Sequence, residues 1–271
     1  MGDLGSASSR AQEMTEISLQ VAPIKAVEAN QEFAFWSQQV LSSGGREQYE
    51  SRTANICLEL TPAGSTIGPE LYSAAVLTND KRFKLKGKYL SPGRYGVGYS
   101  QFAASPFSHD SEKLALVRVR SAREPAFFGV ILEPRSGRQL ACLERRRAIL
   151  HHSWSPTSRY WLSQEMGFWL LWDSTKGGFR SIGAGESFPK HALFLTKDRL
   201  LTFDEASGRL VVRQLPDFEL LLKDDLPTAG QPAFSFPSRS GDALILGTDI
   251  SFPDGPEAES WFRVMVTPEP A

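Results

Sequence analysis

The sequence contains little cysteine, little histidine and no long apolar run. It has two cysteines and four histidines in 271 residues, which is too little cysteine for a disulfide framework or a thiolate metal site. No stretch approaches the roughly 18 consecutive apolar residues of a membrane-spanning helix. The N-terminal region has no apolar core, so it does not resemble a secretory signal. We therefore expect a cytoplasmic protein without membrane contact.

Net charge is nearly absent as well. Thirty basic and thirty-one acidic side chains give a formal charge of -1, which excludes a generally basic nucleic-acid-binding protein. The apolar share of 41% is sufficient to bury a core. Twenty arginines stand against ten lysines, a ratio that points to a GC-rich, bacterial genome.

The sequence motifs of common active sites are missing. There is no His-Glu-x-x-His, Cys-x-x-Cys or calcium-loop spacing, and the neighbouring His151 and His152 would point to opposite faces of a strand. Neither a Gly-x-Ser-x-Gly elbow nor a phosphate-binding glycine loop occurs. Cys57 and Cys142 lie in apolar runs, which is typical of buried, unreactive thiols. We expect no metal and no cofactor.

The sequence does contain one helical pattern followed by many short strands. Apolar residues between Val27 and Leu41 recur at helical spacing and predict an amphipathic helix. Residues 1–25 are expected to be a disordered leader, and residues 26–271 a single domain. Seventeen prolines and twenty-two glycines separate runs of β-branched, aromatic and leucine residues. The predicted strands include Ile56–Leu60, Leu114–Val119, Phe127–Leu132, Trp169–Trp172, Leu200–Phe203, Leu210–Val212 and Ala243–Leu246.

Two sequence elements recur together at intervals of 40 to 41 residues. Residues 130–137 are similar to residues 170–177 and, more loosely, to residues 211–217. A turn-like segment at residues 154–160 matches residues 194–200, and a further copy follows at residues 236–242. A period of about 40 residues is typical of propellers, in which each repeat is one four-stranded blade.

The pattern resembles degenerate WD40-like propeller repeats. Each unit has an aromatic-Ser-Pro turn, an apolar strand ending in a Trp-Asp-like pair, and a glycine-containing turn; Trp172-Asp173 is the one literal Trp-Asp dipeptide. The resemblance covers about residues 98–266, and no unit has the Gly-His pair of the standard repeat. It implies an all-β, propeller-like ring of about five to six four-stranded blades after one N-terminal helix. A β-sandwich is the alternative.

Such a ring needs a core between neighbouring blades and a strand that closes it. Thr53–Leu60 is the candidate to pair beside Trp261–Val266 and close the ring. The residues expected in the core are Phe194, Leu201, Phe203, Val211, Ala243, Leu244 and Ile245.

Charge is unevenly distributed along the chain. Residues 81–123 hold ten basic and two acidic side chains, which gives a local charge of +8. Residues 185–271 hold eight basic and fourteen acidic side chains, which gives a local charge of -6. A strand would place four cations of the basic part on one face. This face is either an interface for an acidic protein or a guard against edge-to-edge pairing of strands. The four cations are Arg82, Lys84, Lys86 and Lys88.

Aromatic residues and arginines form a second candidate surface. Tyr160 and Trp161 are neighbours, so in a strand they face opposite ways, and we expect at least one at the surface. Exposed Tyr, Trp and Arg are frequent interface anchors. Arg145 and Arg146 would border this patch.

These features favour a non-catalytic interaction module that binds one protein partner, as a scaffold or as an inhibitor of the immunity-protein type. An acidic protein is the expected partner, and nucleic acid is disfavoured. The alternative is a propeller hydrolase whose carboxylates line a central channel. The candidate carboxylates are Asp204, Asp217, Asp224 and Asp242.

Overall fold

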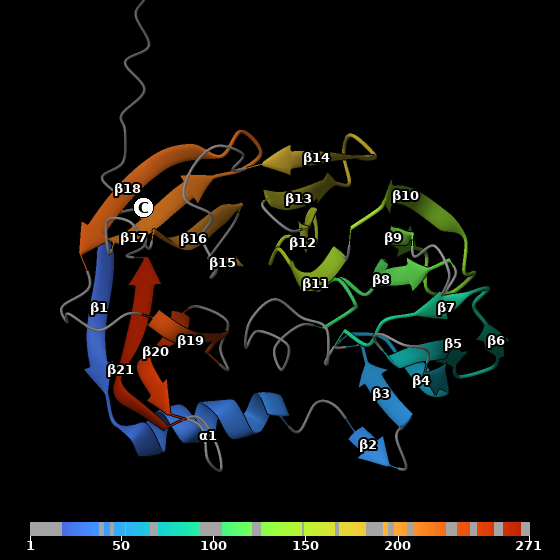
Figure 1. Ribbon diagram of the computed structural model, residues 1–271, viewed down its shortest axis with the longest axis horizontal. Coiled ribbons are helices and arrows are strands. Elements are labelled where there is room, and N and C mark those ends of the chain that lie inside the picture. The colour runs from blue at the N-terminus through green and yellow to red at the C-terminus, as the bar shows by residue number, and fades with distance from the viewer. Residues whose placement is uncertain are drawn as a thin grey trace, which may run out of the picture.

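The computed structural model describes residues 18–37, 41–43, 46–51, 53–65, 70–92, 105–120, 126–147, 149–165, 168–182, 192–194, 198–204, 209–225, 232–238, 243–251 and 257–266. Within these ranges the chain is all-β apart from one helix, α1 (Ala26–Ser37). That helix is too short to cross a membrane, and the described part of the chain has no other. The strands form one nine-stranded sheet and three four-stranded sheets (Figure 1).

All strand pairs are antiparallel, and most join consecutive strands. The nine-stranded sheet contains β2 (Leu41–Ser43), β3 (Arg46–Glu50), β4 (Ile56–Ser65), β5 (Glu70–Thr78), β6 (Arg82–Lys84), β7 (Lys88–Tyr89), β8 (Leu114–Val119), β9 (Phe127–Leu132) and β10 (Gln139–Arg145). The next two sheets contain β11 (Ile149–Trp154), β12 (Tyr160–Glu165), β13 (Phe168–Asp173) and β14 (Gly178–Ile182), then β15 (Ala192–Phe194), β16 (Arg199–Asp204), β17 (Arg209–Gln214) and β18 (Glu219–Asp225). The last sheet contains β1 (Leu19–Ile24), β19 (Pro232–Pro237), β20 (Ala243–Ser251) and β21 (Glu257–Val266).

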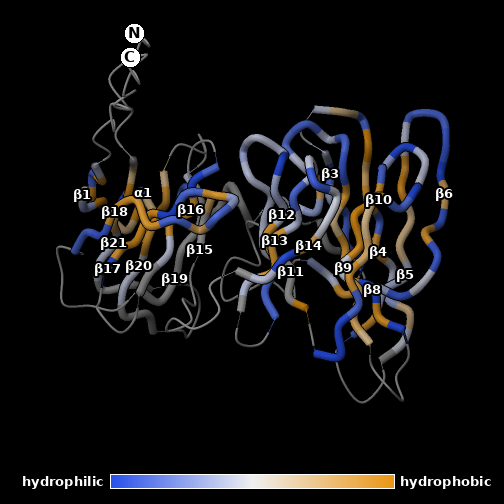
Figure 2. Tube along the Cα trace, turned by 90° about the horizontal axis from the view of Figure 1, so that it is seen from above, coloured by the Kyte–Doolittle hydropathy of each residue, from blue (hydrophilic) through white to orange (hydrophobic). Residues whose placement is uncertain are grey.

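The sheets follow one another along a curved path in the order of the sequence (Figure 1). The nine-stranded sheet lies at one end of the molecule and the sheet of β1 and β19–β21 at the other, as Figures 1 and 2 both show. Helix α1 lies against the last sheet, where Nη2 of Arg263 on β21 meets Oε1 of Glu28 at 3.1 Å and Oε1 of Glu32 at 3.3 Å. The helix thereby covers one side of that sheet.

The hydrophobic core consists of four clusters in series. Middle strands contribute alternate residues to two of them: on β12, Trp161 packs into one cluster, and Tyr160 and Leu162 pack into the next. Strands buried on both faces are what stacked blades require, whereas each sheet of a sandwich keeps a solvent face. The chain therefore does not adopt the sandwich alternative.

Left-handed backbone conformations recur at the predicted period. Gly137, Gly177 and Phe218 have φ of 70°, 67° and 62°, lie 40 and 41 residues apart, and occupy the turns after β9, β13 and β17. The N–H of Gly137 donates to the carbonyl of Glu133, and that of Gly177 to the carbonyl of Asp173, both at 2.8 Å. The sequence repeat therefore corresponds to a structural repeat.

A buried serine marks a second repeated turn. Ser108, Ser155 and Ser238 are at most 1% exposed. In each turn the serine Oγ accepts the N–H of the residue five positions later, and the serine N–H donates to the carbonyl of that residue. Neighbouring turns are also joined, since the N–H of Asp110 donates to Oγ of Ser158 at 2.9 Å. The turns thus form part of the contact between sheets.

The strand that completes the last sheet is β1 and not Thr53–Leu60. β1 pairs with β21 from Leu19↔Val266 to Ile24↔Trp261, whereas β4 lies between β3 and β5. The prediction of a leader over residues 1–25 is therefore wrong for β1, and residues 1–17 lie outside the described residues. Leu19 and Val21 anchor β1 by packing against the core of the last two sheets.

The other predicted elements are largely confirmed. All seven predicted strands lie within observed strands, and the helix expected to start at Val27 begins at Ala26 but ends at Ser37. Cys142, expected inside, is exposed on the outer strand β10, and Cys57 is half-buried. The side chain of Phe203 lies outside the described residues. The remaining predicted core residues are buried: Phe194, Leu201, Val211, Ala243, Leu244 and Ile245.

Candidate functional site

Beyond Leu71, which packs against the second core cluster, one face of β4 and β5 belongs to no core cluster of the described residues. Alternate residues of these strands, such as Leu58 and Tyr72, are buried in the first cluster. The intervening residues Glu59, Thr61 and Ser73 point the other way, and they are half-buried or exposed. The four clusters of the described residues contain none of these three. The core clusters of the described residues therefore leave this part of the face uncovered.

The face is hollowed into a cavity of about 640 Å³, which we call the basic groove. Ser73 and Ala75 of β5 are small, so the longer side chains of the neighbouring strands rise above them on both sides. Ala75 is paired with Glu59 of β4 on one side and with Lys84 of β6 on the other. The groove is lined by Arg46, Glu59, Thr61, Ser73, Ala74, Ala75, Leu77, Arg82, Lys84 and Leu85.

Positive charge exceeds negative charge in the groove. Arg82 forms an ion pair with Glu59 across β5, with side chains 55% and 13% exposed. Lys88 reaches the same face, because its Nζ donates to Oγ of Ser73 at 3.2 Å. Within the ranges that the structure describes, no carboxylate lies at ion-pair distance from Arg46, Lys84 or Lys88. A concave surface with this excess of cations attracts acidic ligands.

The basic face predicted from the sequence is present, but it is not one continuous strand. Leu85 and Tyr89 point into the core between the cations. Gly87 separates β6 from β7 with a φ of 122°, and a Cβ at this position would lie 2.8 Å from Cδ of Arg118 on β8. The chain bends here because it passes close to β8. The exposed cations are Arg82, Lys84, Lys86 and Lys88.

Arg145 and Arg146 lie apart from this groove. Arg145 ends β10, and its Nε donates to Oε2 of Glu165 on β12 at 2.9 Å. The side chain of Glu165 is 6% exposed, so this ion pair joins two neighbouring sheets. Arg146 follows in the next turn and is exposed. Arg145 therefore has a structural contact, and Arg146 borders no aromatic patch of the described residues.

Tyr160 and Trp161 are both fully buried, with 0% exposed. The expectation that at least one of them lies at the surface is therefore wrong. They do face opposite ways, but their sheet lies between two others, so the two rings enter different core clusters. Burial raises the pKa of Tyr160 to about 12. Neither side chain forms part of an interface.

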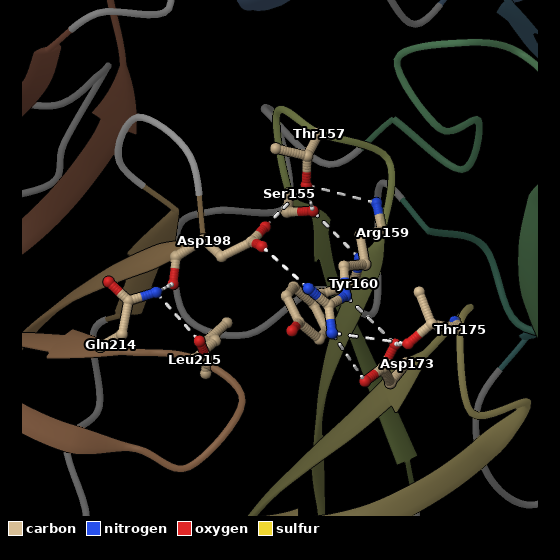
Figure 3. A network of polar contacts seen from close by, with 9 residues as sticks. All are labelled: Ser155, Thr157, Arg159, Tyr160, Asp173, Thr175, Asp198, Gln214 and Leu215. Carbon is tan, nitrogen blue, oxygen red and sulfur yellow. Dashed lines mark hydrogen bonds and ion pairs between the residues drawn. The ribbon is translucent and has the colours of Figure 1, made fainter. Parts of the chain in front are cut away.

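A second polar cluster joins the sheets β11–β14 and β15–β18 (Figure 3). Arg159 lies between two carboxylates, with Nε 3.4 Å from Oδ1 of Asp173 and Nη1 3.5 Å from Oδ2 of Asp198. Oγ1 of Thr157 donates to Oδ1 of Asp198 at 2.7 Å. Oγ1 of Thr175 donates to Oδ1 of Asp173 at 2.7 Å (Figure 3). Both carboxylates are thus held by a shared cation and by hydroxyl groups.

This cluster is a joint between sheets. Burial by itself would raise the pKa of Asp173, but hydrogen bonds from Thr175 and Arg159 outweigh it and hold this pKa below its usual value. A carboxylate that is stabilised in its ionised form is a weak base near neutral pH. Asp173 belongs to the one literal Trp-Asp dipeptide, so that motif also has a structural role here.

Two of the four carboxylates suggested for a hydrolytic channel lie on the outside of their sheet. Asp217 is in the turn between β17 and β18, with a side chain 79% exposed and Oδ1 3.4 Å from Nη1 of Arg180. Asp224 is on β18, the edge strand. Among the residues described, no three His, Cys, Asp or Glu side chains gather as a metal site requires. The side chains of Asp204, Asp242, His151 and His152 lie outside the described residues.

No protein family and no curated protein matches the sequence. Solved structures do match. The β-propeller domain of Cps50 (Swd1) from Myceliophteria thermophila has a TM-score of 0.50 at 12% identity, over 82% of this chain and 73% of that chain. This chain has a β-propeller fold.

Two further solved structures are similar at lower scores. The periplasmic gluconolactonase PpgL from Pseudomonas aeruginosa has a TM-score of 0.42 at 14% identity, over 74% of this chain and 64% of that chain. The β-propeller domain of the Trilobed protease from Pyrococcus furiosus has a TM-score of 0.45 at 9% identity, over 80% of this chain and 67% of that chain. At such identities the likeness concerns the fold alone and assigns no activity to this propeller.

Among the residues that line the groove, the sequence predicted only Arg82 and Lys84 as binding residues. The signal for Glu59 and Thr61 was the alternation of apolar and polar residues in β4, which marks a strand with one exposed face. That strand was instead assigned to the closure of the ring, which would have buried this face. Arg46 gave no signal, because its place beside Thr61 depends on the pairing of β3 with β4.

Proposed function

We propose that this propeller is a non-catalytic interaction module that binds one acidic protein partner through the basic groove. The proposal is supported by a concave sheet face whose residues Glu59, Thr61 and Ser73 belong to no core cluster, and whose cations Arg46, Lys84 and Lys88 have no carboxylate partner among the described residues. Charge of one sign on such a face steers an acidic partner and selects against basic ones. The contacting residues in this proposal are Arg46, Arg82, Lys84, Lys86 and Lys88.

In the same proposal the chain is a WD40-like ring of about five blades. The three four-stranded sheets count as one blade each, and the nine-stranded sheet counts as two, β2–β6 and β7–β10. In this proposal the chain acts as a scaffold subunit or as an inhibitor of the immunity-protein type, and its place is a bacterial cytoplasm. The hydrolase alternative has less support, because Asp217 and Asp224 lie on the outside of their sheet.

Reversing the charge of three lysines tests the proposal. The variant Lys84→Glu, Lys86→Glu, Lys88→Glu should capture the partner from a native cell lysate at least about tenfold less efficiently than the unmodified protein, because the altered groove repels acidic surface. Capture by the unmodified protein should also weaken as salt rises. The melting temperature should stay nearly unchanged, since all three side chains are exposed. The readout is quantitative mass spectrometry of the captured protein.

A matched variant controls for net charge. Lys25, Lys176 and Lys223 are also exposed, and they lie in or beside the sheets that do not form the groove. Their replacement by glutamate changes the total charge equally and should leave capture unchanged. Equal capture by the groove variant and the unmodified protein, or no captured partner at low salt, would refute the proposed function.

A further inference from the structure

Two hydroxyl groups and two cations form a row across the sheet at one end of the basic groove. Thr61 of β4 is paired with Ser73 of β5. Lys88 lies beyond Ser73 and donates to its Oγ at 3.2 Å. On the other side, Arg46 and Thr61 are the residues that follow the pair Glu47↔Leu60 on the two strands, and both line the groove. The row therefore reads Arg46, Thr61, Ser73, Lys88.

The opposite end of the groove is closed by an ion pair. Arg82, which is paired with Leu77, reaches diagonally across β5 to Glu59, which is paired with Ala75. Glu59 is the only carboxylate among the described residues that line the groove, and its charge is matched by Arg82. Arg82 thus neutralises the negative charge of Glu59 in the protein without a ligand.

The cations of the groove that have no acidic partner indicate which anionic group it would bind. Arg46, Lys84 and Lys88 have no carboxylate at ion-pair distance in the described ranges, and two hydroxyl groups lie between them. A carboxylate brings one negative charge and two oxygens, whereas a phosphate monoester brings a charge of about −1.5 to −2 and three acceptor oxygens. Charge-assisted hydrogen bonds to cations favour the second group.

We infer that the basic groove recognises a phosphorylated serine or threonine in an acidic segment of its partner. The phosphoryl group would lie over the row of Arg46, Thr61, Ser73 and Lys88, and Lys84 would approach from β6. Leu77 at the other end of the groove offers apolar surface to a neighbouring ligand side chain. No aromatic side chain is among the described lining residues, so the groove lacks the stacking surface that favours nucleotide bases. This inference rests on the proposed function and adds the chemistry of the ligand.

Removal of the two hydroxyl groups separates this inference from a general attraction to acidic partners. The probe is a fluorescein-labelled acidic heptapeptide with one central phosphoserine, compared by fluorescence anisotropy with the same peptide carrying serine or glutamate there. The phosphopeptide should bind at least about tenfold more tightly than either. In the variant Thr61→Val, Ser73→Ala this preference should fall to less than about threefold, because both hydroxyl donors are gone. The control Ser181→Ala, an exposed serine on β14, should retain it.

The possible results differ for the two proposals. Equal binding of the three peptides would overturn the phosphoryl inference, and so would equal or tighter binding of inorganic phosphate or of a single-stranded oligonucleotide. In those cases partner capture that is lost in the lysine variant would still support the proposed function. If the purified protein self-associates and the lysine variant dissociates it, the groove binds a second copy, and the inference is again overturned. A preference for phosphoserine that depends on Thr61 and Ser73 supports it.

Discussion

Substitution of Trp172 on β13 tests whether this single residue is part of the hydrophobic core. It is 3% exposed, and its ring meets that of Trp154 edge-on with centroids 5.8 Å apart. Trp172→Ala should reduce the free energy of unfolding by about 3–5 kcal/mol, since it removes buried apolar surface and leaves a cavity. Urea denaturation followed by circular dichroism measures this loss, and Trp172→Phe should lose less. A loss under about 1 kcal/mol for the alanine variant would contradict the core assignment.

Single residues also show where sequence reasoning reaches its limit. The alternation of strand residues predicted that Tyr160 and Trp161 face opposite ways, and this is confirmed. Whether a face is open depends on the neighbouring sheet, which lies far away in the sequence. The same limit applies to the groove, because its face depends on the fact that no core cluster of the described residues includes Glu59 or Thr61.

At the scale of elements, the repeated turns offer an internal comparison. Gly137 and Gly177 have nearly the same φ, 70° and 67°. A Cβ at Gly177 would meet nothing within 4 Å, whereas one at Gly137 would lie 3.0 Å from Cε2 of Phe83. Gly177→Ala should therefore cost only about 1–2 kcal/mol for the left-handed backbone, and Gly137→Ala should cost more because Phe83 must also move.

Equilibrium denaturation of both variants measures this difference. In a Phe83→Leu background, which offers a smaller and more flexible neighbour, Gly137→Ala should cost about as much as Gly177→Ala does in the unmodified protein. Equal costs of the two single variants would mean that the turn after β9 does not pack on β6.

Most strands were predictable because each is a local run of apolar or β-branched residues between glycines, prolines or polar turns. The exceptions have tertiary causes. The break between β6 and β7 lies at Gly87, which has a φ of 122° and lies close to the side chain of Arg118 on β8. β1 was missed because its short run of apolar residues becomes a strand through pairing with β21 at the other end of the chain.

At the scale of the whole molecule, β1 joins the two ends of the sequence. Val21 is paired with Val264 and packs against the core of the last two sheets. Val21→Asp should open this pairing and accelerate amide hydrogen exchange in β21 at least about tenfold, while β4 keeps its protection. Hydrogen–deuterium exchange with mass spectrometry resolves the two segments.

The neighbouring residue provides the control for this change. Gln20 is exposed on the same strand, so Gln20→Asp adds the same charge without burying it and should leave exchange in β21 unchanged. Uniform acceleration over the whole chain, or none in β21 of the Val21→Asp variant, would contradict the role of β1 as the strand that completes the last sheet.

The period of the repeat was readable from the sequence, and the way the sheets join was not. Turns at 40- and 41-residue intervals carry a local signal, because each needs a left-handed residue such as Gly137 or Gly177. The nine-stranded sheet arises where β7 pairs with both β5 and β8. That contact involves few residues and leaves no pattern of its own in the sequence.

The pairing of β1 with β21 also has a consequence for the order in which the protein is made. During synthesis β1 and α1 leave the ribosome before any other described element, yet β21, which pairs with β1 and supplies Arg263 to α1, leaves last. The backbone groups of β1 must stay hydrated until then. The last sheet is therefore completed only after β21 has been translated, and a product truncated before β21 would leave β1 without its pairing partner and α1 without Arg263.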